Sequence, residues 1–289
     1  MVADVRRFNR VVSQRIGALD EDFLARGRPL AESRLLWEIG EDGCEVRALR
    51  ARLDLDSGYA SRLLRSLERA GLVTVAPGEH DRRVRVARLT AAGRRECREL
   101  DLRNDDLATS FLAPLTEAQR ERLVEAMGVV ERLLTASMVQ IEPADPLSDA
   151  ARHCLDAYAA ELDRRFEGGF DPGASILPDY EVLRPPGGLL LIATLHGEPV
   201  GCGALRFHDP DPPDIKRMWI DDRVRGVGLG RRLLGALESA AAERGAAQVR
   251  LETNRSLTEA IAMYRASGYE EVAAFNDEAY GDHWFVKDL

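Results

Sequence analysis

Hydrophobic residues recur with a period of about 3.6 residues over most of the first 140 positions, which predicts helices. Helices are predicted at residues 5–23, 30–39, 45–53, 91–111 and 117–140. One further helix, which Asp54 or Asp56 can cap, follows the third of these and ends at Gly71. Between them, residues 72–76 and 84–89 alternate in polarity as the two strands of a hairpin do. Helix, turn, helix and hairpin in this order form a winged helix.

A short proline-containing segment, residues 142–147, divides the chain, because Pro143 and Pro146 interrupt a helix. Beyond it, Ser148 can cap a helix that runs to Phe166. Strands are predicted at residues 189–195, 200–207, 215–220, 248–253 and 284–286. We therefore expect a multidomain chain: a helix-rich winged-helix domain at 1–141, a linker at 142–147, and an α/β domain with a mixed, mostly antiparallel sheet at 148–289.

Composition narrows the class of protein. The 289 residues are 45% hydrophobic, enough for two cores, yet no apolar run reaches the roughly 18 to 20 residues of a membrane span. The N-terminus carries Asp4, Arg6 and Arg7 instead of a signal-peptide core, so we expect a cytoplasmic protein with no membrane partner. The four cysteines lie far apart and without histidines at ligand spacing, which favours reduced structural thiols over a metal site.

The net charge of −9 conceals a basic region. Residues 45–95 hold twelve arginines and six acidic residues, an excess of six positive charges. Such a region is typical of a surface that contacts the phosphate backbone of nucleic acid, although it is also compatible with a solvated face.

Within this region, three segments carry a resemblance: residues 63–73 (LLRSLERAGLV), the wing Asp81-Arg82-Arg83, and residues 89–93 (LTAAG). They resemble the MarR family of transcription regulators, and the resemblance covers about residues 1–140. It implies that the outward face of the helix before Gly71 reads the major groove of double-stranded DNA and that the wing reaches the minor groove. The DNA-binding candidates are Ser57, Tyr59, Ser61, Arg62, Arg65, Arg82 and Arg83. For Arg62 and Arg65 the alternative is a solvated helix face, and one wing arginine could instead pair with Asp81.

The helix at 117–140 carries hydrophobic residues at heptad-like steps, from Leu123 to Met138. So small a domain cannot bury this stripe together with the apolar face of its first helix. We therefore expect a homodimer, as the MarR resemblance also implies, and a near-palindromic operator.

In the second half, the segment Arg225-Gly226-Val227-Gly228-Leu229-Gly230 follows an apolar strand and precedes a helix. Glycines let the backbone approach a ligand, and a helix N-terminus offers unpaired N–H groups, so the segment suits a pyrophosphate. A plain connecting turn is the alternative. A dinucleotide-binding fold fits less well, because Arg231 and Leu233 stand where its third glycine would be needed.

After the strand at 248–253 come Asn254, Ala260, Tyr264 and Gly268-Tyr269. The order R-x-x-G-x-G, strand and N-x5-A-x3-Y-x3-G-Y resembles the GNAT acetyltransferase superfamily over roughly residues 147–289. The resemblance implies that the glycine turn binds the pyrophosphate of acetyl-CoA, a co-substrate, and that the preceding strand pairs with its pantetheine arm. The implied cofactor-binding residues are Met218, Trp219, Ile220, Arg225, Gly226, Val227, Gly228, Leu229, Gly230, Arg231, Asn254 and Tyr264.

Acetyl transfer to an amine requires a neutral amine, a stabilised oxyanion and a proton for the departing thiolate. The resemblance assigns the proton donor to Tyr264, whose alternative role is that of a packed core aromatic. Asn254 would bond the cofactor or position the helix after it, or else be a turn residue. A backbone N–H of the strand at 218–220 would stabilise the oxyanion. Asp214 stands near the start of that strand and His208 just ahead of it; either could relay a proton through water, or neither, and we assign no base.

Three interpretations follow. The favoured one is a bifunctional DNA-binding regulator and acetyl-CoA-dependent N-acetyltransferase. The second is a regulator whose C-terminal domain only senses acetyl-CoA, and the third is an enzyme that uses the winged helix only to dimerise. The amine acceptor, whether a protein lysine, a small amine or an antibiotic, stays open.

Overall fold

The computed structural model describes residues 1–18, 22–78, 81–174, 180–208 and 210–289. The chain divides into two compact units, Met1–Met127 and Gly128–Leu289, which we treat separately. Within the described ranges, no helix is long and apolar enough to cross a membrane.

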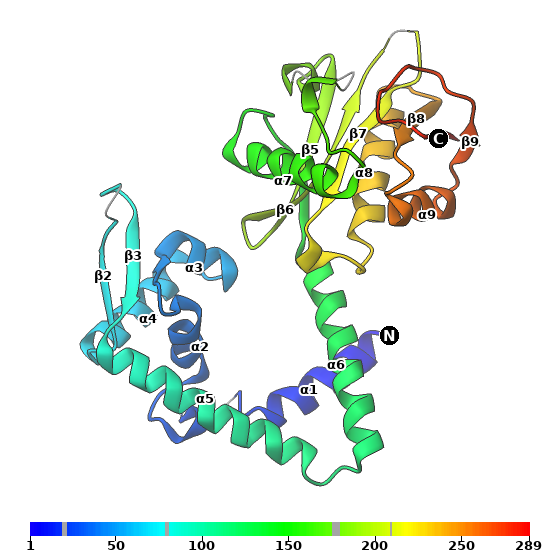
Figure 1. The fold of residues 1–289 in the computed structure, drawn as a ribbon. Helices are drawn as coiled ribbons and strands as arrows, with labels where there is room; N and C mark the ends of the chain where they lie inside the picture. The colour runs from blue at the N-terminus through cyan, green and yellow to red at the C-terminus, as the bar shows by residue number, and fades with distance from the viewer. Residues whose placement is uncertain (19–21, 79–80, 175–179, 209) are drawn as a thin grey trace. The chain divides into compact units, whose positions relative to one another are not determined.

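The first unit is helical with a small sheet (Figure 1). Its elements are α1 (Val2–Arg15), η1 (Phe23–Ala25), α2 (Leu30–Ile39), β1 (Cys44–Glu45), α3 (Val46–Arg52), α4 (Ser57–Arg69), β2 (Val73–Pro77), β3 (Arg85–Leu89) and α5 (Ala91–Leu112). The strands form an antiparallel sheet in the order β1-β3-β2. Leu35, Leu36, Leu67 and Leu100 are among the residues that form one buried core with this sheet. The predicted winged helix is thus present.

Helix α4 begins and ends as its sequence requires. The side chain of Asp56, and not that of Asp54, caps it by accepting a hydrogen bond from Tyr59 N at 2.8 Å. Gly71, at φ +70°, follows its end. Ala60, Leu63 and Leu64 are buried, so the opposite face of the helix is turned to solvent.

The first helix is shorter than predicted. Helix α1 ends at Arg15, whereas the hydrophobic period suggested a helix to Phe23. Gly17 adopts φ +64°, a left-handed conformation that does not continue a helix. Residues 19–21 lie outside the described residues. Helix α1 buries none of its side chains, and Phe8 and Val11 remain about half exposed.

The second unit is built on a seven-stranded sheet. Helix α6 (Glu117–Met138) begins in the first unit and ends in the second. After it follow β4 (Gln140–Pro143), α7 (Asp149–Arg165), η2 (Pro172–Ala174), η3 (Tyr180–Leu183), β5 (Gly188–Leu195), β6 (Glu198–Arg206), β7 (Asp214–Ile220), η4 (Asp222–Val224), α8 (Leu229–Glu243), β8 (Gln248–Thr253), α9 (Thr258–Ala266), β9 (Glu270–Val272) and β10 (His283–Asp288). The strand order is β4-β5-β6-β7-β8-β10-β9. The β7–β8 pair is parallel and the other described pairs are antiparallel, which confirms a mixed, mostly antiparallel sheet.

Helices cover both faces of this sheet. Leu233 and Leu237 of α8 and Ile261 of α9 pack with Leu205 and Leu251 against one face. Ala151, Cys154 and Leu155 of α7 pack with strand residues of the other face. Figure 1 shows α7 and α8 on either side of the strands.

Residues 140–143 differ from the expected pattern. They form β4, which pairs with β5 from Gln140–Thr194 to Pro143–Leu191. The segment in which we expected the linker to begin therefore contributes an edge strand, a position that tolerates proline because one side of the strand needs no backbone donor. Asp145, also in this segment, accepts a hydrogen bond from Arg184 Nε at 3.0 Å.

Candidate functional site

The glycine turn joins β7 and η4 to α8. Gly226 and Gly228 adopt φ values of +76° and +82°, which other residues rarely adopt, and a Cβ added at either would meet open space. Gly228 is the N-cap of the 15-residue helix α8, so the N–H groups of its first turn have no acceptor within the helix. The turn therefore presents an exposed backbone and the positive end of a helix dipole to one place, which is an arrangement suited to a phosphate group.

Gly230 has a different role. A Cβ at this position would lie 3.0 Å from the Sδ atom of Met263, so the glycine permits α8 and α9 to pack closely. The three glycines of the motif thus divide into two that shape the turn and one that sets helix packing.

Arg225 holds the turn from within the protein. Its Nε donates to Ile220 O at 2.7 Å, and its guanidinium forms ion pairs with Glu161 and with Asp222. Burial raises the pKa of the Glu161 carboxyl, but the hydrogen bond and charge of Arg225, together with hydrogen bonds from Arg165 and Trp219, hold that pKa below its ordinary value. Glu161 is therefore a carboxylate that fixes Arg225.

A cavity of about 590 Å³ opens beside this turn. The predicted cofactor-binding residues that line it are Met218, Trp219, Ile220, Arg225, Gly226, Gly228, Leu229, Gly230, Arg231 and Tyr264. Val227 is not among its lining residues and packs instead against a buried cluster with Leu229 and Val224. The cavity thus brings together the turn, the end of β7 and helix α9.

Strand β7 is irregular at Arg217. Two residues of β7, Arg217 and Met218, lie opposite Gly203 of β6, and Arg217 has φ +57°. This is a β-bulge, which redirects side chains out of strict alternation. As a result Lys216, Arg217 and Met218, although consecutive, all line one cavity.

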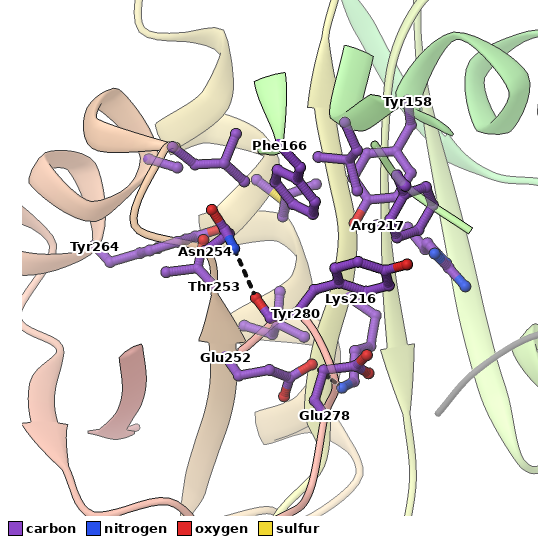
Figure 2. A pocket seen from close by; sticks show the side chains of 16 residues that line it. Tyr158, Phe166, Lys216, Arg217, Glu252, Thr253, Asn254, Tyr264, Glu278 and Tyr280 are labelled. Carbon is purple, nitrogen blue, oxygen red and sulfur yellow. Dashed lines mark hydrogen bonds and ion pairs between the residues drawn. The ribbon is translucent and has the colours of Figure 1, made fainter. Parts of the chain in front are cut away.

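That second cavity has a volume of about 90 Å³ (Figure 2). It is lined by side chains of β7 and β8, beyond the point at which Asp214 of β7 pairs with Arg250 of β8. It is lined by aromatic and charged side chains, which include Tyr158, Phe166, Phe170, Tyr280, Lys216, Arg217, Glu252 and Glu278. The charges are two of each sign.

The two cavities share several residues, namely Tyr158, Leu162, Met218, Leu257, Ala260 and Tyr264. A ligand bound along the glycine turn and a ligand bound in the smaller cavity would therefore meet beside Tyr264. Tyr264 is 5% exposed, and its ring packs near those of Tyr269 and Phe285. Burial, aided by the charges of Tyr158 and Glu252, raises the pKa of Tyr264 above its ordinary value, so its hydroxyl keeps its proton.

Asn254 lines the smaller cavity and not the larger one. Its Nδ2 donates to Tyr280 O at 3.1 Å, the bond drawn in Figure 2, and its Oδ1 accepts from Ser256 N at 3.0 Å. Both ends of the amide thus hold the segment that leads from β8 into α9.

The two candidate bases lie outside both cavities. Asp214, 3% exposed, accepts from Arg250 Nε at 2.6 Å and lies 2.8 Å from His208 Nε2. Neither residue is among the described lining residues of either cavity. Asp214 joins β7 to β8 through Arg250, and His208 holds the same carboxylate from the segment before β7.

The DNA-binding candidates lie together on two surfaces of the first unit. Ser57, Tyr59, Ser61, Arg62 and Arg65 are all exposed on α4, and the Arg62 guanidinium lies 5.5 Å from the Tyr59 ring centroid. Arg82 and Arg83 are exposed between β2 and β3, where Asp81 Oδ1 accepts from Arg83 N at 2.8 Å. Asp81 thus shapes the hairpin through the backbone.

Sequence reasoning missed several site residues: Glu161, Arg165, Arg217, Glu252, Glu278 and Tyr280. The sequence of α7 does contain a pattern that indicates two of them. Glu161 lies three residues after Tyr158 and Arg165 four residues after Glu161, so all three side chains share one face of the helix. Charged residues on a stripe expected to be buried indicate a site. No such signal marks Arg217, because a bulge is invisible in the alternation of residues.

Comparisons with known proteins match each half of the chain. Residues 155–269 match the model of the acetyltransferase (GNAT) family, and residues 26–84 match that of the MarR family. An IAA acetyltransferase of Azospirillum brasilense is 32% identical over 138 residues, which are 47% of this chain and 88% of the relative.

Solved structures resemble the second half. A GNAT-family acetyltransferase of Staphylococcus aureus has 18% identity and a TM-score of 0.45, covering 52% of this chain and 99% of that one. The PaiA N-acetyltransferase of Thermoplasma acidophilum, in complex with coenzyme A, has 17% identity and a TM-score of 0.41, covering 52% and 99%.

Proposed function

Because this chain belongs to the acetyltransferase (GNAT) family and carries a MarR-family region ahead of that domain, we propose that it joins acetyl-CoA-dependent N-acetylation of an amine to DNA-binding regulation. One observation carries the enzymatic half: the larger cavity runs from the glycine turn to Tyr264, where the smaller, charged cavity meets it. A two-substrate transfer needs two such spaces that meet at one reacting point.

The residues of this chain fit acetyl-CoA. The turn at Gly226 and Gly228 and the first turn of α8 would bind its pyrophosphate, and the end of β7 would align its pantetheine arm. Bound acetyl-CoA supplies an activated thioester. Arg225, whose guanidinium is held by Glu161 and Ile220 O, would support the turn and not contact the phosphates directly.

At the meeting point, the residues of the chain have separate tasks. The buried, protonated Tyr264 hydroxyl would donate to the departing sulfur, and a backbone N–H of residues 218–220 would stabilise the oxyanion. Asn254 would position the start of α9 through its bonds to Tyr280 and Ser256, and with it Tyr264.

Incubation of the full chain with acetyl-CoA and a broad set of amines tests this half through the release of free thiol. Acetylation of at least one amine is the expected result. If acetyl-CoA binds but no amine is acetylated, the domain is a sensor of acetyl-CoA, and the enzymatic half of the proposal is wrong.

The regulatory half has its own support. The outward face of α4 and the wing arginines are exposed in a segment with an excess of six positive charges. We assign this face to the major groove and the wing to the minor groove of a near-palindromic operator read by a homodimer. The chain would act in the cytoplasm, with access to both DNA and acetyl-CoA.

The dimer would form through α1, α5 and α6. The side chains of Val5, Phe8, Leu102, Met127 and Leu134 are each about half exposed or more. Apolar stripes of this length rarely stay in contact with water in a stable protein, so a second copy is the natural cover.

A further inference from the structure

Helix α6 ends against the first turn of α8. The side chain of Arg232, in that turn, donates from Nη1 to Ala136 O and from Nη2 to Val139 O, the latter at 3.0 Å. These two carbonyls stand at the C-terminal end of α6, where carbonyl groups lack donors from their own helix and the helix dipole favours a cation. Arg232 therefore caps α6 from the helix that carries the glycine turn.

A buried cluster makes a second link between α6 and this turn. Val139, which follows α6, is 3% exposed and packs in one cluster with Val224 and Leu229. Val224 and Leu229 also line the larger cavity. The backbone N–H of Arg232 donates to Gly228 O at 3.1 Å, so one turn of helix holds both the left-handed glycine and the arginine. A polar contact and an apolar contact thus join the end of α6 to the turn assigned to the pyrophosphate.

The same end of α6 has a second, exposed face. Leu134 and Met138 are 57% and 47% exposed, whereas Ala136 between them is 6% exposed. Residues four positions apart share one face of a helix, so Leu134 and Met138 continue the apolar stripe that we assign to the dimer. Residues 128–138 of α6 and all of α8 belong to the second unit. Within that unit, one face of this segment contacts the start of α8 and the other is available to a second copy of the chain.

The neighbouring arginines of α8 are directed to different places. Arg231 lines the larger cavity. Arg232 is not among the described lining residues of either cavity, and its guanidinium binds the end of α6. The two residues are therefore a matched pair, in which only Arg231 stands where a ligand of the larger cavity would be in contact with it.

Resting on the proposed acetyl-CoA site and the proposed dimer, we infer that the two are coupled through Arg232, so that acetyl-CoA stabilises the dimer. A ligand bound to the glycine turn restricts the first turn of α8 and, through Arg232 and Val139, the end of α6. A helix that is already ordered loses less conformational entropy when a second copy packs on its other face. By linkage, the dimer then binds acetyl-CoA more tightly than the monomer does. The operator, which the dimer reads, would be bound more tightly when acetyl-CoA is abundant.

The test measures the dimer dissociation constant of the full chain by light scattering over a dilution series, with and without saturating acetyl-CoA. We expect acetyl-CoA to lower this constant by about fivefold or more. Calorimetry should show weaker acetyl-CoA binding by Met127→Glu combined with Leu134→Glu, the variant designed to be monomeric. Amide hydrogen exchange of residues 128–139 should slow when acetyl-CoA binds to the parent chain.

Arg232→Ala should still bind acetyl-CoA but lose most of the effect of acetyl-CoA on the dimer. Arg231→Ala is the matched control: it should weaken acetyl-CoA binding, yet at saturation the effect on the dimer should remain. If Arg232→Ala does not melt cooperatively, the parent chain alone decides.

A dimer dissociation constant that acetyl-CoA leaves unchanged or raises in the parent overturns the inference, and so does the full effect in a folded Arg232→Ala. A parent chain that fails to bind acetyl-CoA, or fails to dimerise, instead overturns the proposed function.

Discussion

Trp219 Nε1 on β7 donates a hydrogen bond to Glu161 Oε2 on α7 at 2.9 Å. The same carboxylate pairs with Arg225 of the glycine turn, and its Oε1 accepts from Arg165 Nη1 at 3.2 Å. Arg165 in turn donates to Glu259 of α9 at 2.6 Å. One carboxylate therefore connects the strand, the turn and, through Arg165, the second wall of the larger cavity.

Glu161→Gln should weaken acetyl-CoA binding by about tenfold, because three donors lose a charged acceptor and the turn is held less firmly. Calorimetric titration of acetyl-CoA measures this. Asp156→Asn, on an exposed position of the same helix, is the control and should bind like the parent. Equal affinity of Glu161→Gln and the parent would remove Glu161 from the account.

Asp282 should make the free energy of unfolding depend on pH in the acidic range. Its hydrogen bond with Arg255, opposed by burial, lowers its pKa from 3.8 to about 2. Since the folded pKa lies below the unfolded one, its contribution to the free energy of unfolding is complete above about pH 4 and is lost as pH falls through 2.

Asp282→Asn should therefore lower the melting temperature of the second unit at pH 7, and the difference from the parent should shrink below pH 4. Differential scanning calorimetry at several pH values follows this. A difference independent of pH would mean that the carboxylate charge is not the cause.

Arg82→Ala combined with Arg83→Ala should weaken DNA binding and reduce its dependence on salt. For each phosphate that the protein neutralises, the logarithm of the affinity falls by ~0.9 for each log unit of added salt. Fluorescence anisotropy with a mixed-sequence duplex of double-stranded DNA, measured over a salt series, gives the slope. Arg152→Ala combined with Arg164→Ala, two exposed arginines of α7, is the control. An unchanged slope in the wing variant would show that the wing does not contact the backbone.

The full chain should be a dimer in solution at micromolar concentration, as measured by light scattering. Met127 and Leu134 are 50% and 57% exposed on α6, so Met127→Glu combined with Leu134→Glu should shift the mass towards the monomer by placing charges in the interface. A monomeric parent chain would contradict the proposed dimer.

Much of this architecture follows from local pattern. Helices α2 and α4 and strand β8 could be placed from hydrophobic period, Asp56 and Gly71, because those signals lie within a few residues of the elements they define. Strand β4 could not, since a four-residue edge strand with a proline carries no alternation of its own and forms only through its pairing with β5. The end of α1 does not follow from the sequence pattern, because the hydrophobic period continues past Gly17.

The site divides in the same way. The glycine turn and Tyr264 are recognisable because motif residues sit at fixed spacing in one segment. Glu161, Arg217 and Glu278 come from segments far apart in the sequence. Glu161 of α7 reaches the larger cavity beside its ion-pair partner Arg225, and a bulge in β7 places Arg217 in the lining of the smaller cavity. Asp214 and His208 are candidate bases because they are near β7 in the sequence. Sequence position alone does not indicate that Arg250 binds Asp214 from a neighbouring strand.

We propose that Tyr264 acts at a point where two substrates meet, and a comparison of Tyr264→Phe with Gly228→Asp tests this role. Acetyl-CoA affinity by calorimetry and thiol release with an accepted amine are measured for both variants and the parent. Tyr264→Phe should bind acetyl-CoA like the parent but turn over ~10²-fold more slowly, because only the proton donor is lost. Gly228→Asp should lose binding itself, because a carboxylate at φ +82° opposes the pyrophosphate by charge and strains the turn. If Tyr264→Phe turns over as fast as the parent, Tyr264 is only a core residue, and the account of the reacting point is wrong.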